Sequence, residues 1–108
     1  MPLFITIGYG DRDGYDRTDE DVRNAAHEHD ERLRLAGVVM GIAGPPIQVR
    51  NHGGTGAQAK TGQYLSADLP VAGFAIIEAA NMDDAVAAVA QTPCAVSHGV
   101  VEVWPLQQ

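Results

Sequence analysis

The C-terminal stretch over residues 60–106 constrains the fold of this chain more than any other part of the sequence. A glycine turn is followed by a nearly continuous apolar run over residues 72–79 (AGFAIIEA), which is typical of a buried strand. Asn81 can cap a helix that Pro93 is expected to end, and residues 100–104 (VVEVW) predict a last strand. Because the connections are short, this helix is expected to pack on one face of the sheet that the strands form.

The N-terminal half begins with the same order of strand and helix. Residues 3–7 (LFITI) alternate between two sets of side chains, and we expect the odd-numbered set to face the core while Phe4 and Thr6 face away from it. The polar residues 11–17 predict a loop. Residues 19–36 predict a helix, with acidic side chains at its start and a glycine directly after its end.

The middle of the chain predicts further strands. Residues 37–43 (GVVMGIA) are apolar and rich in β-branched side chains, and Ile47 and Val49 continue the pattern after two prolines, as one bent strand or as two short ones. The glycine-rich residues 51–56 predict a turn, which leads back into a hairpin strand over residues 57–61.

These elements predict an α+β fold, a ferredoxin-like βαββαβ sheet with two helices on one face. The other face is left bare and carries many apolar side chains, which is unfavourable for a monomer in water. Two copies packed face to face would cover it. The sequence therefore predicts a homodimer.

Composition limits the range of partners. The 108 residues predict a single domain over residues 1–108, and 7 Lys and Arg against 14 Asp and Glu give a net charge of −7. Nucleic acids and anionic membranes need concentrated positive charge, so neither is an expected partner. With one cysteine, Cys94, no signal-peptide pattern and no long apolar segment, we expect a soluble cytoplasmic protein.

The C-terminal half resembles the YCII-related family, and in particular its DGPF branch, which has a D-G-P-F turn, a G-G-[FY] strand, a D-E-A helix and a V-E-V-[RW]-P-L ending. The matching positions are Gly62, Gly73, Phe74, Asp84, Ala85, Pro93, Val101, Glu102, Val103, Pro105 and Leu106. The resemblance implies a dimeric α+β barrel with a pocket between sheet and partner. It also implies a site histidine on the first helix, which His29 or His27 matches.

The chain departs from this family pattern in the turn. Thr61, Gln63 and Tyr64 stand where the family has its aspartate, proline and phenylalanine, and Thr92 stands where smaller relatives carry a second aspartate. The partner that the resemblance implies for the histidine is therefore missing, and Asp68 or a carboxylate of the other subunit would have to replace it.

His29 is the first candidate for a functional residue. It fills the gap in the apolar stripe of the first predicted helix, where an ionisable group has to be paired, solvated by a pocket or neutral. A structural histidine bonded to backbone is the alternative. His27, Asp30 and their acidic neighbours are interpreted as a solvated face.

Metal, phosphate and nucleophile sites are not expected. His27 and His29 lie on opposite sides of a helix, so they cannot share one metal ion. The acidic residues 11–16 lack the spacing of a calcium loop, and the glycine turn lacks the lysine and following helix of a phosphate-binding loop. Cys94 is interpreted as a packed side chain. No cofactor motif is present, so no cofactor is expected.

Two functions remain open. The first is a cofactor-free enzyme of lyase, isomerase or cyclase type, in which His29, Asp68, Tyr64 and Tyr9 move protons on a small hydrophobic, oxygenated molecule. The second is a non-catalytic dimer that binds a metabolite or regulates another process. Independently of both, we expect Glu102, which lies in a strand expected to be central or near-central, to be held by Arg50, Lys60 or an amide near Gly62.

Overall fold

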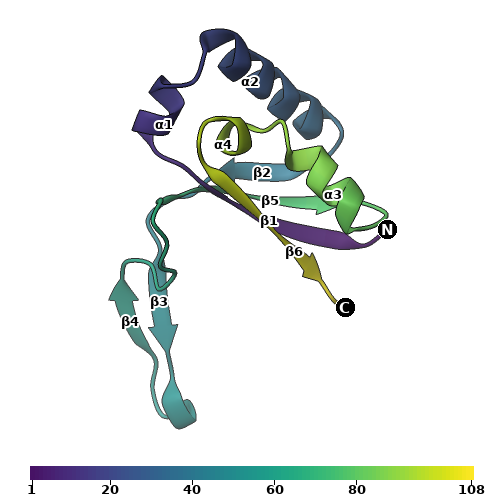
Figure 1. Cartoon of the computed structure of the whole chain (residues 1–108). Coiled ribbons are helices and arrows are strands. Elements are labelled where there is room, and N and C mark those ends of the chain that lie inside the picture. Colours follow the sequence, from purple (N-terminus) through teal and green to yellow (C-terminus); the bar gives the residue numbers. More distant parts are fainter.

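A four-stranded antiparallel sheet forms the centre of the computed structural model, which describes residues 1–108 (Figure 1). The strand order is β2-β5-β1-β6, and each neighbouring pair is antiparallel. The bounds are β1 (Leu3–Tyr9), β2 (Val39–Ile42), β5 (Val71–Glu78) and β6 (Val100–Leu106). The predicted mixed α+β class is confirmed.

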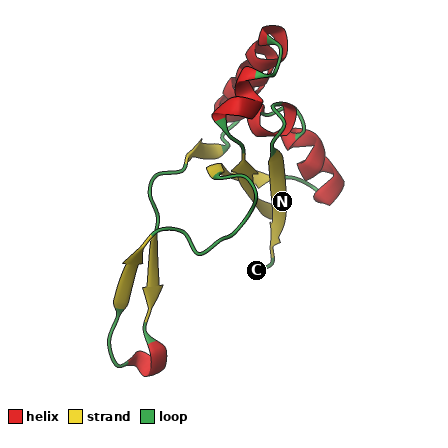
Figure 2. Cartoon of the chain, turned by 60° about the vertical axis from the view of Figure 1, so that its left-hand side comes forward, coloured by secondary structure: helices red, strands yellow, loops and turns green.

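Two longer and two short helices lie on one side of this sheet (Figures 1 and 2). They are α1 (Arg12–Asp16), α2 (Glu20–Leu35), α3 (Met82–Val89) and α4 (Pro93–Val96). The opposite side of the sheet carries no helix. None of the four helices has both the length and the apolar composition that crossing a bilayer requires.

Two local predictions were wrong, and both concern short helices. The segment predicted as a loop contains α1, because the side chain of Asp11 accepts a hydrogen bond from the amide of Gly14 at 2.8 Å and so caps a turn of helix. Pro93 begins α4 as well as following α3, since a proline is well suited to the first turn of a helix, where its missing N–H is not needed. Asn81 caps α3 as predicted.

The core lies between the sheet and the helices. The odd-numbered residues of the first strand were predicted to face it, but in the structure the even-numbered residues Phe4 and Thr6 do. Phe4 is only 4 % exposed and Ile77 only 2 %, and both pack with Ala85 and Val89 of α3. Because α3 offers only small side chains to the sheet, the volume of the core has to come from strand residues such as Phe4. Thr6 is buried on this same face.

The other face, which we call the open sheet face, is apolar and lacks a cover. Its centre is a row across all four strands, in which Ile5 pairs with both Ile76 and Trp104, and Ile76 pairs with Val39. Ile76, Trp104 and Val39 are exposed. The apolar residues of this face are Leu3, Ile5, Ile7, Val39, Phe74, Ile76, Trp104 and Leu106, and the register also places Glu78 and Glu102 on it.

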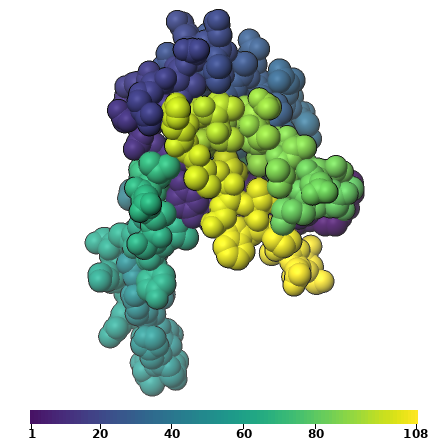
Figure 3. Space-filling model, in the orientation of Figure 1, coloured from purple at the N-terminus to yellow at the C-terminus, as the bar shows by residue number.

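A hairpin projects from the body of the molecule, and we call it the arm (Figures 2 and 3). It consists of β3 (Ile47–Arg50), the short 3-10 turn η1 (His52–Gly54) and β4 (Gln58–Thr61), paired with each other and with no strand of the main sheet. The predicted hairpin is thus confirmed, with Gly53 and Gly54 both at a φ of 71° in its turn. The arm gives the chain a radius of gyration of 15.8 Å, whereas a compact domain of this length has about 13 Å.

Candidate functional site

A cavity of about 810 Å³ lies between the helices and the sheet, and we call it the inner cavity. Its apolar wall includes Leu33 of α2, Met40 of β2, and Ile77 and Val89 from the core. Its polar lining includes Tyr15, His27, Asp30, Thr92, Cys94 and Ser97. The mixture of an apolar wall and a few polar groups is typical of a site for a small organic molecule.

Glycines on the strands make room for this cavity. A Cβ atom at Gly8 would lie 3.0 Å from the Sγ atom of Cys94, and one at Gly73 would lie 2.5 Å from the carbonyl oxygen of Gly41. Side chains at these positions would push against α4 and against β2. Gly8 and Gly73 therefore allow close backbone packing and leave the floor of the cavity flat.

Asp30 is the part-buried acidic group of the inner cavity, which the exposed Asp11 also lines. Its Oδ1 atom is buried and has no hydrogen-bond partner. Burial raises the pKa of the Asp30 carboxyl, although the positive charges of Arg34, His27 and His29 act in the opposite direction. A carboxyl group held in this way keeps its proton to higher pH and, once ionised, is a stronger base than an exposed aspartate. Because the Asp30 carboxyl is harder to ionise in the folded chain than in the unfolded chain, its contribution to the free energy of unfolding falls as the pH rises through its raised pKa.

Ser97 supplies a second unsatisfied polar atom. The residue is 6 % exposed, and its buried Oγ atom has no hydrogen-bond partner. The neighbouring Thr92, by contrast, donates a hydrogen bond to the carbonyl oxygen of Val89 at 2.6 Å. Buried polar groups are nearly always paired, so Asp30 and Ser97 mark places where a bound molecule could supply the missing partners.

Cys94 lies part-buried in the lining of the same cavity. Burial raises the pKa of its thiol, and the negative charge of Asp30 raises it further. The thiol is therefore protonated at neutral pH, which is the opposite of what a nucleophilic cysteine needs. Its role in the cavity is that of a small, weakly polar wall.

Tyr15 and His27 form a pair at the side of the cavity. The hydroxyl oxygen of Tyr15 lies 2.8 Å from Nε2 of His27, within hydrogen-bonding distance. The guanidinium of Arg23 lies 4.9 Å from the centre of the Tyr15 ring. His27 is exposed, as predicted, yet this bond ties α2 to α1 next to Asp30.

His29, the first candidate from the sequence, lies outside the inner cavity. Its Nε2 atom is 2.7 Å from the carbonyl oxygen of Ala88, so the ring nitrogen donates a hydrogen bond to the backbone of α3. Its Nδ1 atom lies 3.4 Å from Nη2 of Arg32. This arrangement links the two long helices and matches the structural alternative, while a catalytic role for His29 stays a prediction.

Tyr9 is buried, and its hydroxyl donates a hydrogen bond to Oε1 of Glu102 at 3.0 Å. Burial raises the pKa of Tyr9, and the hydrogen bond and the charge of Glu102 raise it further. Glu102 is thus held by a partner, but the expected partners Arg50 and Lys60 were wrong. Both belong to the arm, which does not join the main sheet, and β6 is an edge strand and not a central one.

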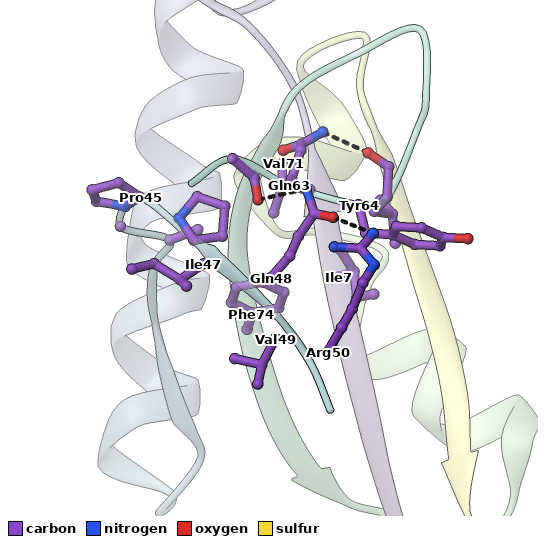
Figure 4. Close-up of a pocket in the computed structure, with 15 residues that line it drawn as sticks. Ile7, Pro45, Ile47, Gln48, Val49, Arg50, Gln63, Tyr64, Val71 and Phe74 are labelled. Carbon is purple, nitrogen blue, oxygen red and sulfur yellow. Dashed lines mark hydrogen bonds between the residues drawn. The ribbon is translucent and has the colours of Figure 1, made fainter. Parts of the chain in front are cut away.

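Tyr64 and Asp68 both lie outside the inner cavity. Tyr64 is exposed and lines a second cavity of about 750 Å³, the outer cavity, between the base of the arm and the open sheet face (Figure 4). Asp68 is exposed and lines neither cavity. No hydrogen bond joins any two of the four predicted residues, and no two of them line the same cavity. These residues are His29, Asp68, Tyr64 and Tyr9.

Asp30 was placed on the solvated face by the sequence analysis, and helical spacing gives no signal that would have corrected this. In an α-helix Asp30 lies about 40° from the direction of Ala26, whereas His29 lies about 60° from it on the other side. Ala26 is buried and Leu33, which lies about 20° from Ala26 towards His29, lines the inner cavity, so the stripe that they define runs midway between Asp30 and His29 and does not distinguish them.

No three side chains of His, Cys, Asp or Glu lie close enough together to hold a metal ion. The chain was also compared with known proteins. A scan against protein-family models and a search of curated proteins found no match.

Proposed function

We propose that the chain is a cofactor-free acid–base enzyme of lyase, isomerase or cyclase type, acting on a small, hydrophobic, oxygenated molecule in the inner cavity. The observation that carries this proposal is the Asp30 carboxyl, which lies in a largely apolar cavity with a buried, unpartnered oxygen and a raised pKa. Groups with perturbed pKa values in cavities are frequent in active sites.

The residues that line the inner cavity have different roles in this proposed reaction. The Asp30 carboxylate takes a proton from a carbon atom next to a carbonyl group, and the Ser97 hydroxyl donates a hydrogen bond to the carbonyl oxygen, where negative charge develops. The protonated Asp30 then returns the proton to a different atom or to the same one. Leu33, Met40 and Val89 hold the hydrocarbon part and exclude water. Asp30 thus takes the place of His29 and Asp68 in the mechanism.

Proton exchange on acetophenone tests this proposal. We expect the protein to accelerate replacement of the methyl protons by deuterium in heavy water, followed by proton NMR, and Asp30→Asn to lower the protein-dependent rate by about 100-fold or more. Asp83→Asn is the matched control, since this exposed carboxylate in the first turn of α3 lines neither cavity. Ser97→Ala should lower the rate by about 10-fold or more.

An equal rate in Asp30→Asn and the parent protein would contradict the assignment of Asp30. Binding of acetophenone in the inner cavity without any exchange would favour the alternative, a non-catalytic metabolite-binding or regulatory module. That alternative has one observation in its favour, because no second ionisable side chain is hydrogen-bonded to Asp30.

The finer features of the fold belong to the same proposal. The strand order β2-β5-β1-β6 with helices on one face supports a ferredoxin-like arrangement. The exposed apolar residues of the open sheet face support a homodimer packed through that face, a dimeric α+β barrel of the kind that the YCII-related resemblance implies. A second copy is the occupant that this face fits, since both copies offer the same uncharged central row.

Light scattering is expected to give about twice the chain mass of 11.4 kDa. Ile76→Lys puts a charge into the centre of the open sheet face, so it should shift the protein to monomers. Val86→Lys is the matched control, because Val86 on α3 is 48 % exposed, close to the 45 % of Ile76, and lies on the helix side. A parent protein that stays monomeric would refute the dimer.

A further inference from the structure

The outer cavity contains an arginine that has no acidic partner. Arg50 is part-buried, and its guanidinium lies within 4 Å of no carboxylate, whereas Arg17 and Arg34 both pair with acidic side chains. Arg12, Arg23, Arg32 and Lys60 also form no salt bridge, so what distinguishes Arg50 is its place in the outer cavity. Arg50 is also the only basic residue among those that line the outer cavity.

Hydrogen bonds fix the direction of this arginine (Figure 4). Its Nη2 atom donates to Oε1 of Gln48 at 2.8 Å, and Nε2 of Gln48 donates to the carbonyl oxygen of Gly62 at 3.2 Å. Gln48 and Arg50 are two residues apart on β3 and so lie on the same face of the arm. One of the five N–H donors of Arg50 is used by this chain of bonds, and the others are free for a ligand.

One aromatic side chain lies next to the guanidinium, and a second lines the same cavity. The Cζ atom of Arg50 is 5.8 Å from the centre of the Tyr64 ring, and Phe74 and Ile7 line the cavity from the open sheet face. A planar positive group beside apolar rings fits a ligand that has a carboxylate at one end and a ring at the other. One basic residue matches one negative charge, and a phosphate dianion would need more.

We propose that the outer cavity is a binding site for a small aromatic monocarboxylate, with Arg50 holding the carboxylate and Tyr64 and Phe74 contacting the ring. The outer cavity adjoins the inner one, since Ala43, Val71 and Phe74 line both, but the proposed proton-transfer residues Asp30 and Ser97 line only the inner cavity. In the proposed dimer the second copy would lie over the open sheet face and narrow this cavity, so the protein is tested in its native oligomeric state.

Phenylacetate is the probe for this site, titrated into labelled protein and followed by backbone and side-chain NMR shifts. We expect shifts at Arg50, Gln48 and Gly62 with saturation at millimolar concentration, and binding about 10-fold or more tighter than that of neutral phenylacetamide. Arg50→Gln should weaken phenylacetate binding by about 10-fold or more. Lys60→Gln is the matched control, since Lys60 pairs with Gln48 across the arm but does not line the cavity.

The role of the ring has its own comparison. Tyr64→Leu should weaken phenylacetate more than acetate, because acetate has no ring to contact. The proposal is overturned if phenylacetate does not bind, if Arg50→Gln and Lys60→Gln have equal effects, or if phenyl phosphate binds more than about 10-fold tighter than phenylacetate. Shifts confined to Asp30 and Ser97 would also overturn it, and they would leave the proposal for the inner cavity intact.

Discussion

Gly99→Ala is expected to lower the free energy of unfolding by about 3 kcal/mol, at the upper end of the usual cost of overpacking. A Cβ atom at Gly99 would clash with the carbonyl oxygen of Tyr9 and lie 2.6 Å from the carbonyl oxygen of Cys94. Both are backbone atoms, so neither can rotate away as a side chain could. Relief requires β1 and α4 to move apart, which would also open the wall of the inner cavity.

Gly56→Ala is the matched control for this substitution. A Cβ atom at Gly56 would have no atom of another part of the chain within 4 Å, and this glycine has no positive φ, so an alanine there should change the stability by less than about 0.5 kcal/mol. Urea unfolding followed by circular dichroism measures both variants. Equal stabilities of the two variants would show that β1 and α4 are not in close contact at Gly99.

Phe4→Ala is expected to lower the free energy of unfolding by about 3–5 kcal/mol, the usual cost of removing a buried phenylalanine. Phe4 packs against Ile77, Ala85 and Val89, and these neighbours are too small or too well fixed to fill the space that it leaves. The loss should not depend on protein concentration, because Phe4 lies inside the single chain.

Ile5→Ala is the informative comparison, since the two neighbouring residues face opposite sides of the sheet. Ile5 lies on the open sheet face, so its removal should cost less within one chain and should weaken the dimer instead. Its effect on stability should therefore depend on protein concentration. A larger, concentration-independent loss for Ile5→Ala than for Phe4→Ala would place the core on the other face.

Local patterns in the sequence predicted the elements well, and the reasons are local too. The cap at Asn81, the glycine turn of the arm and the apolar run that became β5 each depend on residues within one turn or one strand. The choice of the core face was wrong because alternation shows two sets of side chains without saying which one meets the helices. That choice depends on the small side chains of α3, far away along the chain.

The candidate site could be predicted only in part for the same reason. The burial of Asp30 and Ser97 is set by how α2, α4 and the sheet pack together, and no short sequence pattern records it. His29 and Asp30 are adjacent in the sequence, yet one bonds to the backbone of α3 and the other lines the inner cavity. Arg50 and Tyr64 are brought together by the hairpin, 14 residues apart, which spacing alone did not suggest.

The arm also affects what spectroscopy can report about this molecule. Its two strands bond to each other and to no strand of the main sheet, and two-stranded hairpins have little stability of their own in water. The one tryptophan, Trp104, belongs to β6. Its fluorescence therefore follows the sheet, and a single smooth melting curve from it can coexist with an arm that has already lost its order.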